Sequence, residues 1–247
     1  MFVKSATVCL FLCISSLIAG PVVAAQDADK APKPSKLFSS DDTLEVRMTA
    51  PWKEIERNEK FQGAYPGSIE FTDELGNVTR FDMTAERRGI TRQRECRFPP
   101  IKLRFEKKSV KGTTFRGEKS LKMVTHCNKG TIYIQYYVIE MLVYRMFNLI
   151  TDFSFRVRPL SVTYVDSDTG KEGDPMFAFL IEDDGDVAKR NDMKKLDLPR
   201  TTPGRLHTQQ AANVALFQYM ISNLDWAATN GPATKECCHN AKLIGLD

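Results

Sequence analysis

The segment from Ala215 to Ile244 reads ALFQYMISNLDWAATNGPATKECCHNAKLI, and it decides the fold that the sequence predicts. Its first part has the apolar spacing of a helix face, and it then runs into Asn223-Leu224-Asp225-Trp226 and a polar loop. A helix that delivers an aspartate to a loop, with an asparagine further along, is how phosphoryl-transfer enzymes hold a catalytic carboxylate beside a metal-binding amide. The segment therefore indicates phosphoryl-transfer chemistry near the end of the chain.

The sequence before this segment is rich in strand patterns. Alternation of apolar and polar residues and good turn signals, such as Gly76-Asn77, predict strands and two hairpins. The first hairpin joins residues 68–71 to 78–83, and the second joins 160–165 to 176–180 across an acidic connection. Further strands are expected around residues 44–48, at 101–106 and at 121–124.

Two helices are expected among these strands. Residues 132–148 are too long for an ordinary strand, and their polar residues are sparse, so we expect a substantially buried helix. Residues 208–222 form the second helix, with an apolar stripe along one face. Glu140 lies in the first helix, and a buried carboxylate needs a partner.

The order of these elements predicts an α+β chain with two lobes. We expect a β-rich lobe over residues 41–182, which contains one long helix and holds nucleotide phosphates. A partial helical lobe over residues 183–247 would carry the reactive aspartate. Residues 1–25 read as a signal peptide, and residues 26–40 read as a flexible linker.

The N-terminus predicts export. Lys4 provides a positive start, Val8 to Ala19 is largely apolar, and small residues precede a cut ahead of Gln26. We therefore expect a periplasmic or secreted protein with no stable membrane span after cleavage, and an uncleaved anchor is the alternative. The formal net charge of +4 gives no argument for binding nucleic acid.

Four cysteines follow the signal peptide, and their even number in an exported chain suggests two disulfides. Cys237 and Cys238 are adjacent, and a bond between neighbours is geometrically strained. We therefore expect them to reach Cys96 and Cys127. A zinc site with His239 as a further ligand is the alternative, but the paired C-x-x-C spacing is missing.

Two charged stretches leave alternatives open. Five arginines between residues 87 and 97 form either a solvated basic face or a surface that faces phosphate groups. The connection at residues 166–175 is either a polar hairpin loop or a calcium loop. Lys171 and Phe177 occupy the places where a calcium loop of the EF-hand type needs Gly and Glu.

Taken in order, pieces of residues 86–244 resemble the CotH kinase family, exported bacterial proteins of an atypical kinase-like branch. Arg88-Gly89-Ile90-Thr91-Arg92 is similar to the family's R-G-x-x-R strand, and residues 100–105 are similar to its S-F-K-I-K-F strand. Residues 138–144 resemble its L-R-E-K-L-A-Y helix, and residues 177–182 its G-L-Y-L-L-x-E strand. Asn223-Leu224-Asp225 and residues 239–244 resemble its N-x-D loop and N-N-Y-Y-L-Y strand.

The resemblance implies ATP and magnesium as cofactors, and a protein or other hydroxyl acceptor. It implies that Lys102 reaches the nucleotide phosphates and that Glu140 pairs with Lys102. Asp225 would orient or deprotonate the acceptor. The remaining implied roles are magnesium binding by Asn240 or its rival Asn230, phosphate support by Arg88 and Arg92, and a place for Glu182 beside the cofactor.

Each of these assignments has a structural alternative. Lys102 could be a solvated strand residue, Glu140 could pair with Tyr144 or a structural arginine, and Asp225 could cap the loop after its helix. The family also has a second metal-binding aspartate after the last strand, whereas this chain stops at Asp247. We therefore expect either an enzyme that lacks one part, and is inactive for that reason, or a non-catalytic envelope interaction protein.

Overall fold

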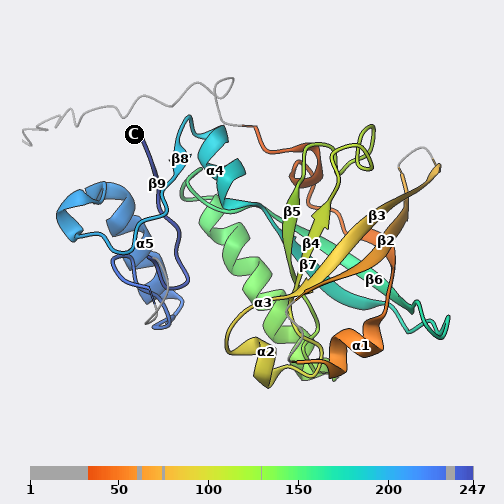
Figure 1. Cartoon of the computed structure of the whole chain (residues 1–247). Helices are drawn as coiled ribbons and strands as arrows, with labels where there is room; N and C mark the ends of the chain where they lie inside the picture. Colours follow the sequence, from red (N-terminus) through yellow and green to blue (C-terminus); the bar gives the residue numbers. More distant parts are fainter. Residues whose placement is uncertain (1–32, 60–62, 74–75, 129, 232–236, 247) are drawn as a thin grey trace, which may run out of the picture. The chain divides into compact units, whose positions relative to one another are not determined.

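Seven strands close into a barrel in the computed structural model, which describes residues 33–59, 63–73, 76–128, 130–231 and 237–246 (Figure 1). The strands are β1 (Leu44–Ala50), β2 (Ala64–Thr72), β3 (Val78–Arg87), β4 (Ile101–Phe105), β5 (Ser120–Val124), β6 (Val157–Asp166) and β7 (Met176–Ile181). They pair in the order β1-β2-β3-β4-β5-β7-β6. Every neighbouring pair is antiparallel except β1 and β6, which run parallel and close the barrel.

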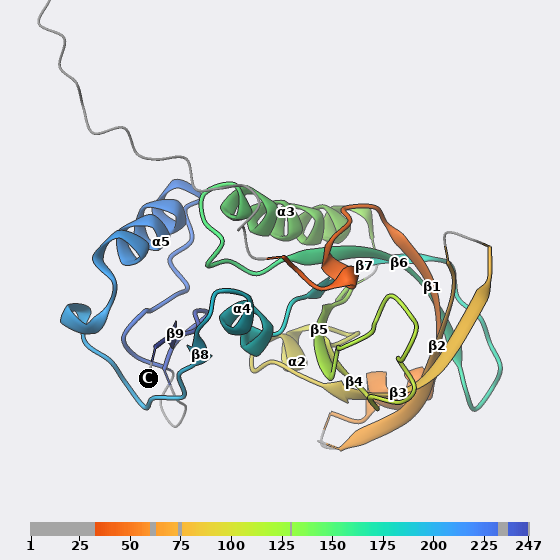
Figure 2. The same ribbon diagram turned by 90° about the horizontal axis from the view of Figure 1, so that it is seen from above.

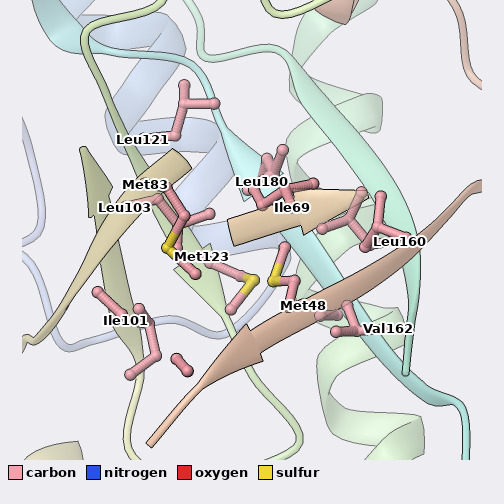
Figure 3. Close-up of a cluster of buried hydrophobic side chains, with 14 of the residues drawn as sticks. Met48, Ile69, Met83, Ile101, Leu103, Leu121, Met123, Leu160, Val162 and Leu180 are labelled. Atoms are coloured by element: carbon pink, nitrogen blue, oxygen red, sulfur yellow. The ribbon is translucent and has the colours of Figure 1, made fainter. Parts of the chain in front are cut away.

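Apolar side chains fill the inside of the barrel because alternate residues of each strand point inward. In β4, for example, Ile101, Leu103 and Phe105 are buried, whereas Lys102 and Arg104 lie on the outer face. Figure 3 shows how side chains from different strands meet in this core. Its labelled residues are Met48, Ile69, Met83, Ile101, Leu103, Leu121, Met123, Leu160, Val162 and Leu180.

Segments between the strands add to the same core. Helix α1 (Trp52–Arg57) buries Ile55, and its Trp52 donates a hydrogen bond from Nε1 to the carbonyl of Met48 at 2.9 Å. The β4–β5 connection contributes Phe115, whose ring lies 5.2 Å from that of Phe81. A short 3-10 helix, η2 (Lys36–Phe38), buries Leu37 and so packs the last residues of the predicted linker against the barrel.

Helix α3 (Thr131–Asn148) packs against the outer face of β6 and β7 (Figure 1). Tyr137 and Met141 of the helix form a second buried cluster with Phe179 and Ile181 of β7. Both faces of β7 are therefore covered, since its other residues point into the barrel. This explains why β7 reads as a continuous apolar run rather than as an alternating one.

The remaining elements lie beside α3 and the end of β7 (Figure 2). They are α2 (Arg92–Glu95), α4 (Asp184–Arg190), η3 (Pro203–Arg205), α5 (Thr208–Met220) and the short pair β8 (Lys194–Lys195) and β9 (Ile244–Gly245). Helix α5 contacts the end of α3 through the rings of Phe217 and Phe147, whose centroids are 4.8 Å apart. Helix α4 contacts both β8 and β9.

The predicted two-lobed, kinase-like fold is wrong. The strand patterns are real, but β6 returns to pair with β1, so the sheet closes into a mixed barrel instead of forming an open β-rich lobe. Among the described residues, those after β7 form two α-helices and a two-stranded sheet, which do not make a helical lobe. Local periodicity cannot predict this closure because the pairing joins residues more than one hundred positions apart.

The individual elements are predicted better than the fold. Both hairpins are confirmed by the antiparallel pairs β2–β3 and β6–β7, and Gly76 has the positive φ of +81° that its turn requires. The two expected helices are confirmed as α3 and α5. The expectation that the first is substantially buried is wrong, since its outward face is exposed. The signal peptide lies outside the described residues.

The expected disulfide pairing is also wrong. Cys96 bonds to Cys127, with an S–S distance of 2.01 Å, and Cys237 bonds to its neighbour Cys238. The first bond joins the end of α2 to the segment before α3. The last cysteines therefore do not tie the end of the chain to its first half.

Candidate active site

Asp225 lies in a turn that follows α5. The side chain of Asn223 shapes this turn, because its Oδ1 accepts a hydrogen bond from the backbone N of Asp225 at 3.0 Å. Its Nδ2 donates to Gln218 Oε1 at 2.7 Å, which fastens the turn to the helix. The backbone of Asp225 is thus held, while 78% of its side chain remains exposed to a ligand.

The segment after Cys238 returns to this turn. A pair of backbone hydrogen bonds of 2.9 and 3.1 Å joins Ala227 to His239. His239 Nε2 consequently lies 2.6 Å from Asp225 Oδ1, and Asn240 Nδ2 lies 2.9 Å from Oδ2. The structure therefore brings together Asp225 and Asn240, the residues predicted to act as the catalytic carboxylate and the metal-binding amide.

Asn230, the rival for the metal-binding role, borders the same site. Its backbone carbonyl accepts a hydrogen bond from the backbone N of His239 at 3.0 Å, and the residue is exposed. Both candidate amides thus lie in the loops that surround Asp225. No group of three or more His, Cys, Asp and Glu side chains in the described residues is placed to hold a metal, and this applies to the zinc alternative at His239.

Lys102 lies on the outer face of the barrel in a row that crosses three strands. Its cross-strand neighbours are Glu86 of β3 and Lys122 of β5. Glu86 also pairs with Arg104 at 2.5 Å. Lys102 is therefore one of two adjacent lysines on this face, and the sequence reasoning chose the more peripheral of the two.

Lys122 is the lysine that faces the C-terminal segment. Burial lowers the pKa of Lys122, and this effect is opposed by Asp184 and reinforced by the positive charges of Arg88 and Lys242. Its Nζ lies 5.5 Å above the ring of Phe155. The charges around Lys122 are mixed, since Asp183 and Asp184 accompany Arg88 and Lys242, and a partly buried amine is stabilised by a nearby anion.

Arg88 and Arg92 extend the positive charge toward α3. Arg92 Nη2 forms an ion pair with Glu140 Oε2 at 2.9 Å, so the predicted partner of Glu140, Lys102, is replaced by an arginine. Burial lowers the pKa of Arg88, which lies near Tyr144, Arg92 and Glu140. Burial also raises the pKa of Tyr144 to about 12, so this phenol stays neutral.

The arginine-rich stretch is thus divided between two roles. Arg87 points inward and donates hydrogen bonds to the carbonyls of Ile55 and Gln93. Arg97 pairs with Glu56 at 2.5 Å. Arg88 and Arg92 remain on the face that carries Lys122, so they are the members that could contact phosphate.

Glu182 is held by the protein itself. Its Oε1 pairs with Arg190 Nε at 2.9 Å, and its Oε2 accepts from the backbone N of Arg156 at 2.9 Å. Both Glu182 and Arg190 are buried, which makes the pair part of the packing at the end of β7. A cofactor would have to displace these contacts, so the geometry favours a structural role for Glu182.

Sequence reasoning missed Lys122, Lys242 and Asp184. Asp184 and Lys242 line a small cavity of about 50 Å³ together with residues of the α3–β6 connection and β9. Lys242 is two residues from Asn240 and its charge acts on Lys122, so it relates the Asp225 turn to the face of Lys122. The sequence signal that could have identified Lys122 was the strand pattern of residues 121–124, in which this lysine stands between the apolar residues Leu121 and Met123.

The larger hollow of the described surface lies elsewhere. It has a volume of about 590 Å³ and lies between β1, β2 and the β6–β7 connection. Tyr65, Gly67 and Arg80 line it together with Asp168 of the possible calcium loop, and none of the residues predicted for phosphoryl transfer lines it. The cavity lined by Asp184 and Lys242, at about 50 Å³, is by contrast far below the roughly 300–1,000 Å³ that usually encloses a small molecule.

The residues of the site fit phosphate and magnesium in kind. Arginine and lysine are the usual phosphate-binding side chains. Magnesium is commonly held by one or two carboxylates together with phosphate oxygens of the substrate. Asp225 offers an exposed carboxylate that could share a magnesium ion with a phosphate-bearing ligand, whereas Asn240 turns its amide nitrogen toward Asp225 and would have to rotate to offer its carbonyl oxygen.

No protein-family model, no curated protein and no solved structure matches this chain. None of the helices in the described residues is long and apolar enough to cross a membrane. The case for a function therefore rests on the residues of the site.

Proposed function

We propose that this chain is an exported, CotH-like phosphotransferase that uses ATP and magnesium and transfers a phosphoryl group to a hydroxyl acceptor, with a protein as one candidate class. The observation that carries the proposal is the contact of Asp225 with Asn240. Asn240 is two residues from Lys242, whose charge acts on Lys122. A reactive carboxylate and a cationic face are the two parts that phosphoryl transfer needs.

The cationic face would bind the phosphates. Arg88, Lys122 and Lys242 supply three positive charges, and Asp184 and Asp183 are the acids that act on Lys122. Desolvation lowers the pKa of Lys122, and attraction to a bound anion would offset this cost to the charged form. Binding in this site would then depend chiefly on phosphate charge, because the cavity lined by Asp184 and Lys242 is only about 50 Å³.

Asp225 would act on the acceptor. Its exposed carboxylate is placed to accept the proton of a hydroxyl group as that oxygen attacks the phosphorus atom. Asn240 and His239 hold the two carboxylate oxygens and so fix their orientation. A bound magnesium ion would neutralise charge on the transferring phosphoryl group.

Turnover of ATP tests this role of Asp225. In the presence of magnesium, Asp225→Asn should lower the rate of phosphate release or autophosphorylation by about 10²-fold or more, as expected for loss of a general base. Binding of ATP should remain, because the positive residues are intact. Asp168→Asn on the exposed β6–β7 connection is the matched control and should leave the rate unchanged.

Two results would contradict the proposal. The first is an Asp225→Asn variant that keeps the full rate. The second is the absence of any shift in melting temperature at millimolar ATP and magnesium, since a ligand that binds the native state raises it.

A non-catalytic interaction protein of the cell envelope is the second candidate. It is favoured by the large apolar side chains that α3 and α5 expose, among them Tyr136, Leu216 and Tyr219. This candidate predicts partner binding without turnover of ATP, so the assay with Asp225→Asn separates the two.

A further inference from the structure

Helix α3 exposes an apolar face on the side away from the barrel. Its inner face is covered by β6 and β7, but nine large apolar side chains of the helix and the turn after it remain exposed. One is Tyr133, and the other eight, which we call the α3 outer face, are Ile132, Tyr136, Ile139, Leu142, Met146, Leu149, Ile150 and Phe153. A helix that is apolar all round is normally covered on every side, so this face indicates an interface.

The spacing of the exposed residues indicates that the partner is a helix. Four exposed residues, Ile132, Tyr136, Ile139 and Met146, and the half-buried Val143 follow one another at intervals of four, three, four and three residues. This alternation is the seam of a helix that packs lengthwise against another helix, since it repeats every seven residues. The seam runs along the whole of α3, which at 1.5 Å per residue is about 27 Å long.

We propose that the α3 outer face binds the same face of a second copy of this chain, with the two α3 helices antiparallel. None of its eight residues is charged, so two identical faces can meet without repulsion. Tyr136 is 58% exposed and would lose on the order of 100 Å² on contact. Eight side chains of similar loss approach the ~800 Å² per partner of a standard interface.

The antiparallel arrangement follows from how the face is distributed along the chain. A two-fold axis between Leu142 and Val143 places Ile139 opposite Met146 and Tyr136 opposite Leu149. It also places Ile132, at the start of the face, opposite Phe153, at its end. Three pairs of residues of the α3 outer face thus meet, Ile150 lies opposite Gln135, and the two helix dipoles oppose each other.

Sedimentation of the full chain tests the proposal. We expect a reversible dimer that Leu142→Glu weakens at least tenfold, because the variant places two carboxylates beside the axis. Leu216→Glu on α5 is the matched control, since Leu216 is also exposed, at 62% against 45% for Leu142. The control should keep the dimer.

Cross-linking tests the orientation and does not depend on a charged variant. Leu142→Cys should form a disulfide-linked dimer under mild oxidation, whereas Ile132→Cys should not, because its counterpart lies at the far end of the partner helix. Circular dichroism would confirm that each variant is folded. A chain that stays monomeric at about 100 µM, a dimer that is insensitive to Leu142→Glu, or efficient cross-linking through Ile132→Cys would each overturn the proposal.

Discussion

Glu118 is the residue whose environment departs most from what its sequence position suggests. It lies in the connection before β5, and it is buried although nothing in the local pattern marks it as a core residue. Its Oε1 accepts a hydrogen bond from Ser35 Oγ at 2.6 Å, and its Oε2 has no hydrogen-bond partner among the described residues. Burial, together with the nearby acids Asp186, Glu182 and Asp183, raises its pKa to about 7.

This carboxyl group should make folding stability depend on pH. Its pKa is 4.5 when unfolded and about 7 when folded, so its stabilising contribution is complete below pH 4.5 and is lost as the pH rises through 7. Glu118→Gln should remove this dependence and stabilise the protein at pH 8 by on the order of 2 kcal/mol. Urea unfolding at pH 5 and pH 8 measures the effect.

Glu106→Gln is the control for this measurement, because Glu106 lies in the same connection but is exposed. It should leave the difference in unfolding free energy between pH 5 and pH 8 unchanged. A Glu118→Gln variant with the pH dependence of the parent chain would show that Glu118 is not the titrating group.

At the scale of elements, the Cys96–Cys127 bond fastens α2 to the start of α3. Through this link, Arg92 of α2 stays beside Glu140 of α3, and Arg88 precedes the same short helix. The positive residues on this side of the candidate site therefore depend on a cross-link between two segments of the chain.

Loss of this cross-link should destabilise the fold. The bonded cysteines are 31 residues apart, and closure of a loop of this length is worth about 3 to 4 kcal/mol in the chain-entropy model. The double variant Cys96→Ser/Cys127→Ser should lose free energy of unfolding of this order in guanidinium titrations. The double variant Cys237→Ser/Cys238→Ser is the comparison, since adjacent cysteines close almost no loop. Equal losses in the two double variants would contradict this account.

At the scale of the whole molecule, the elements could be predicted from sequence and their assembly could not. Alternation in β1 and β4 and the turn at Gly76 are local signals, and each is present in the structure. The parallel pairing of β1 with β6 is not local, and it turns the expected open lobe into a barrel. The predicted disulfide pairing was wrong for the same reason, because the spacing of cysteines in the sequence does not determine which of them meet in the fold.

The candidate site shows a similar division. The sequence grouped Asp225 with Asn240, and the two lie in contact. Lys102 was chosen because its strand resembles the family's S-F-K-I-K-F strand, whereas Lys122 is the lysine whose charge interacts with those of Arg88 and Lys242. The residues next to a lysine in the sequence do not show whether distant segments bury it. The choice between Lys102 and Lys122 therefore required the three-dimensional structure. The apolar pattern of α3 was read as burial, although half of it faces outward.

The central claim is that the face of Lys122 and the Asp225 turn serve one phosphate-binding site. Calorimetric titration with ATP and magnesium tests it most directly, with Lys122→Met as the variant and Lys111→Met, an exposed lysine of the β4–β5 connection, as the control. The account predicts at least a tenfold loss of affinity for Lys122→Met, little change for Lys111→Met, and competition by inorganic triphosphate. Unchanged affinity in Lys122→Met, or no binding by the parent chain at millimolar ATP, would contradict it.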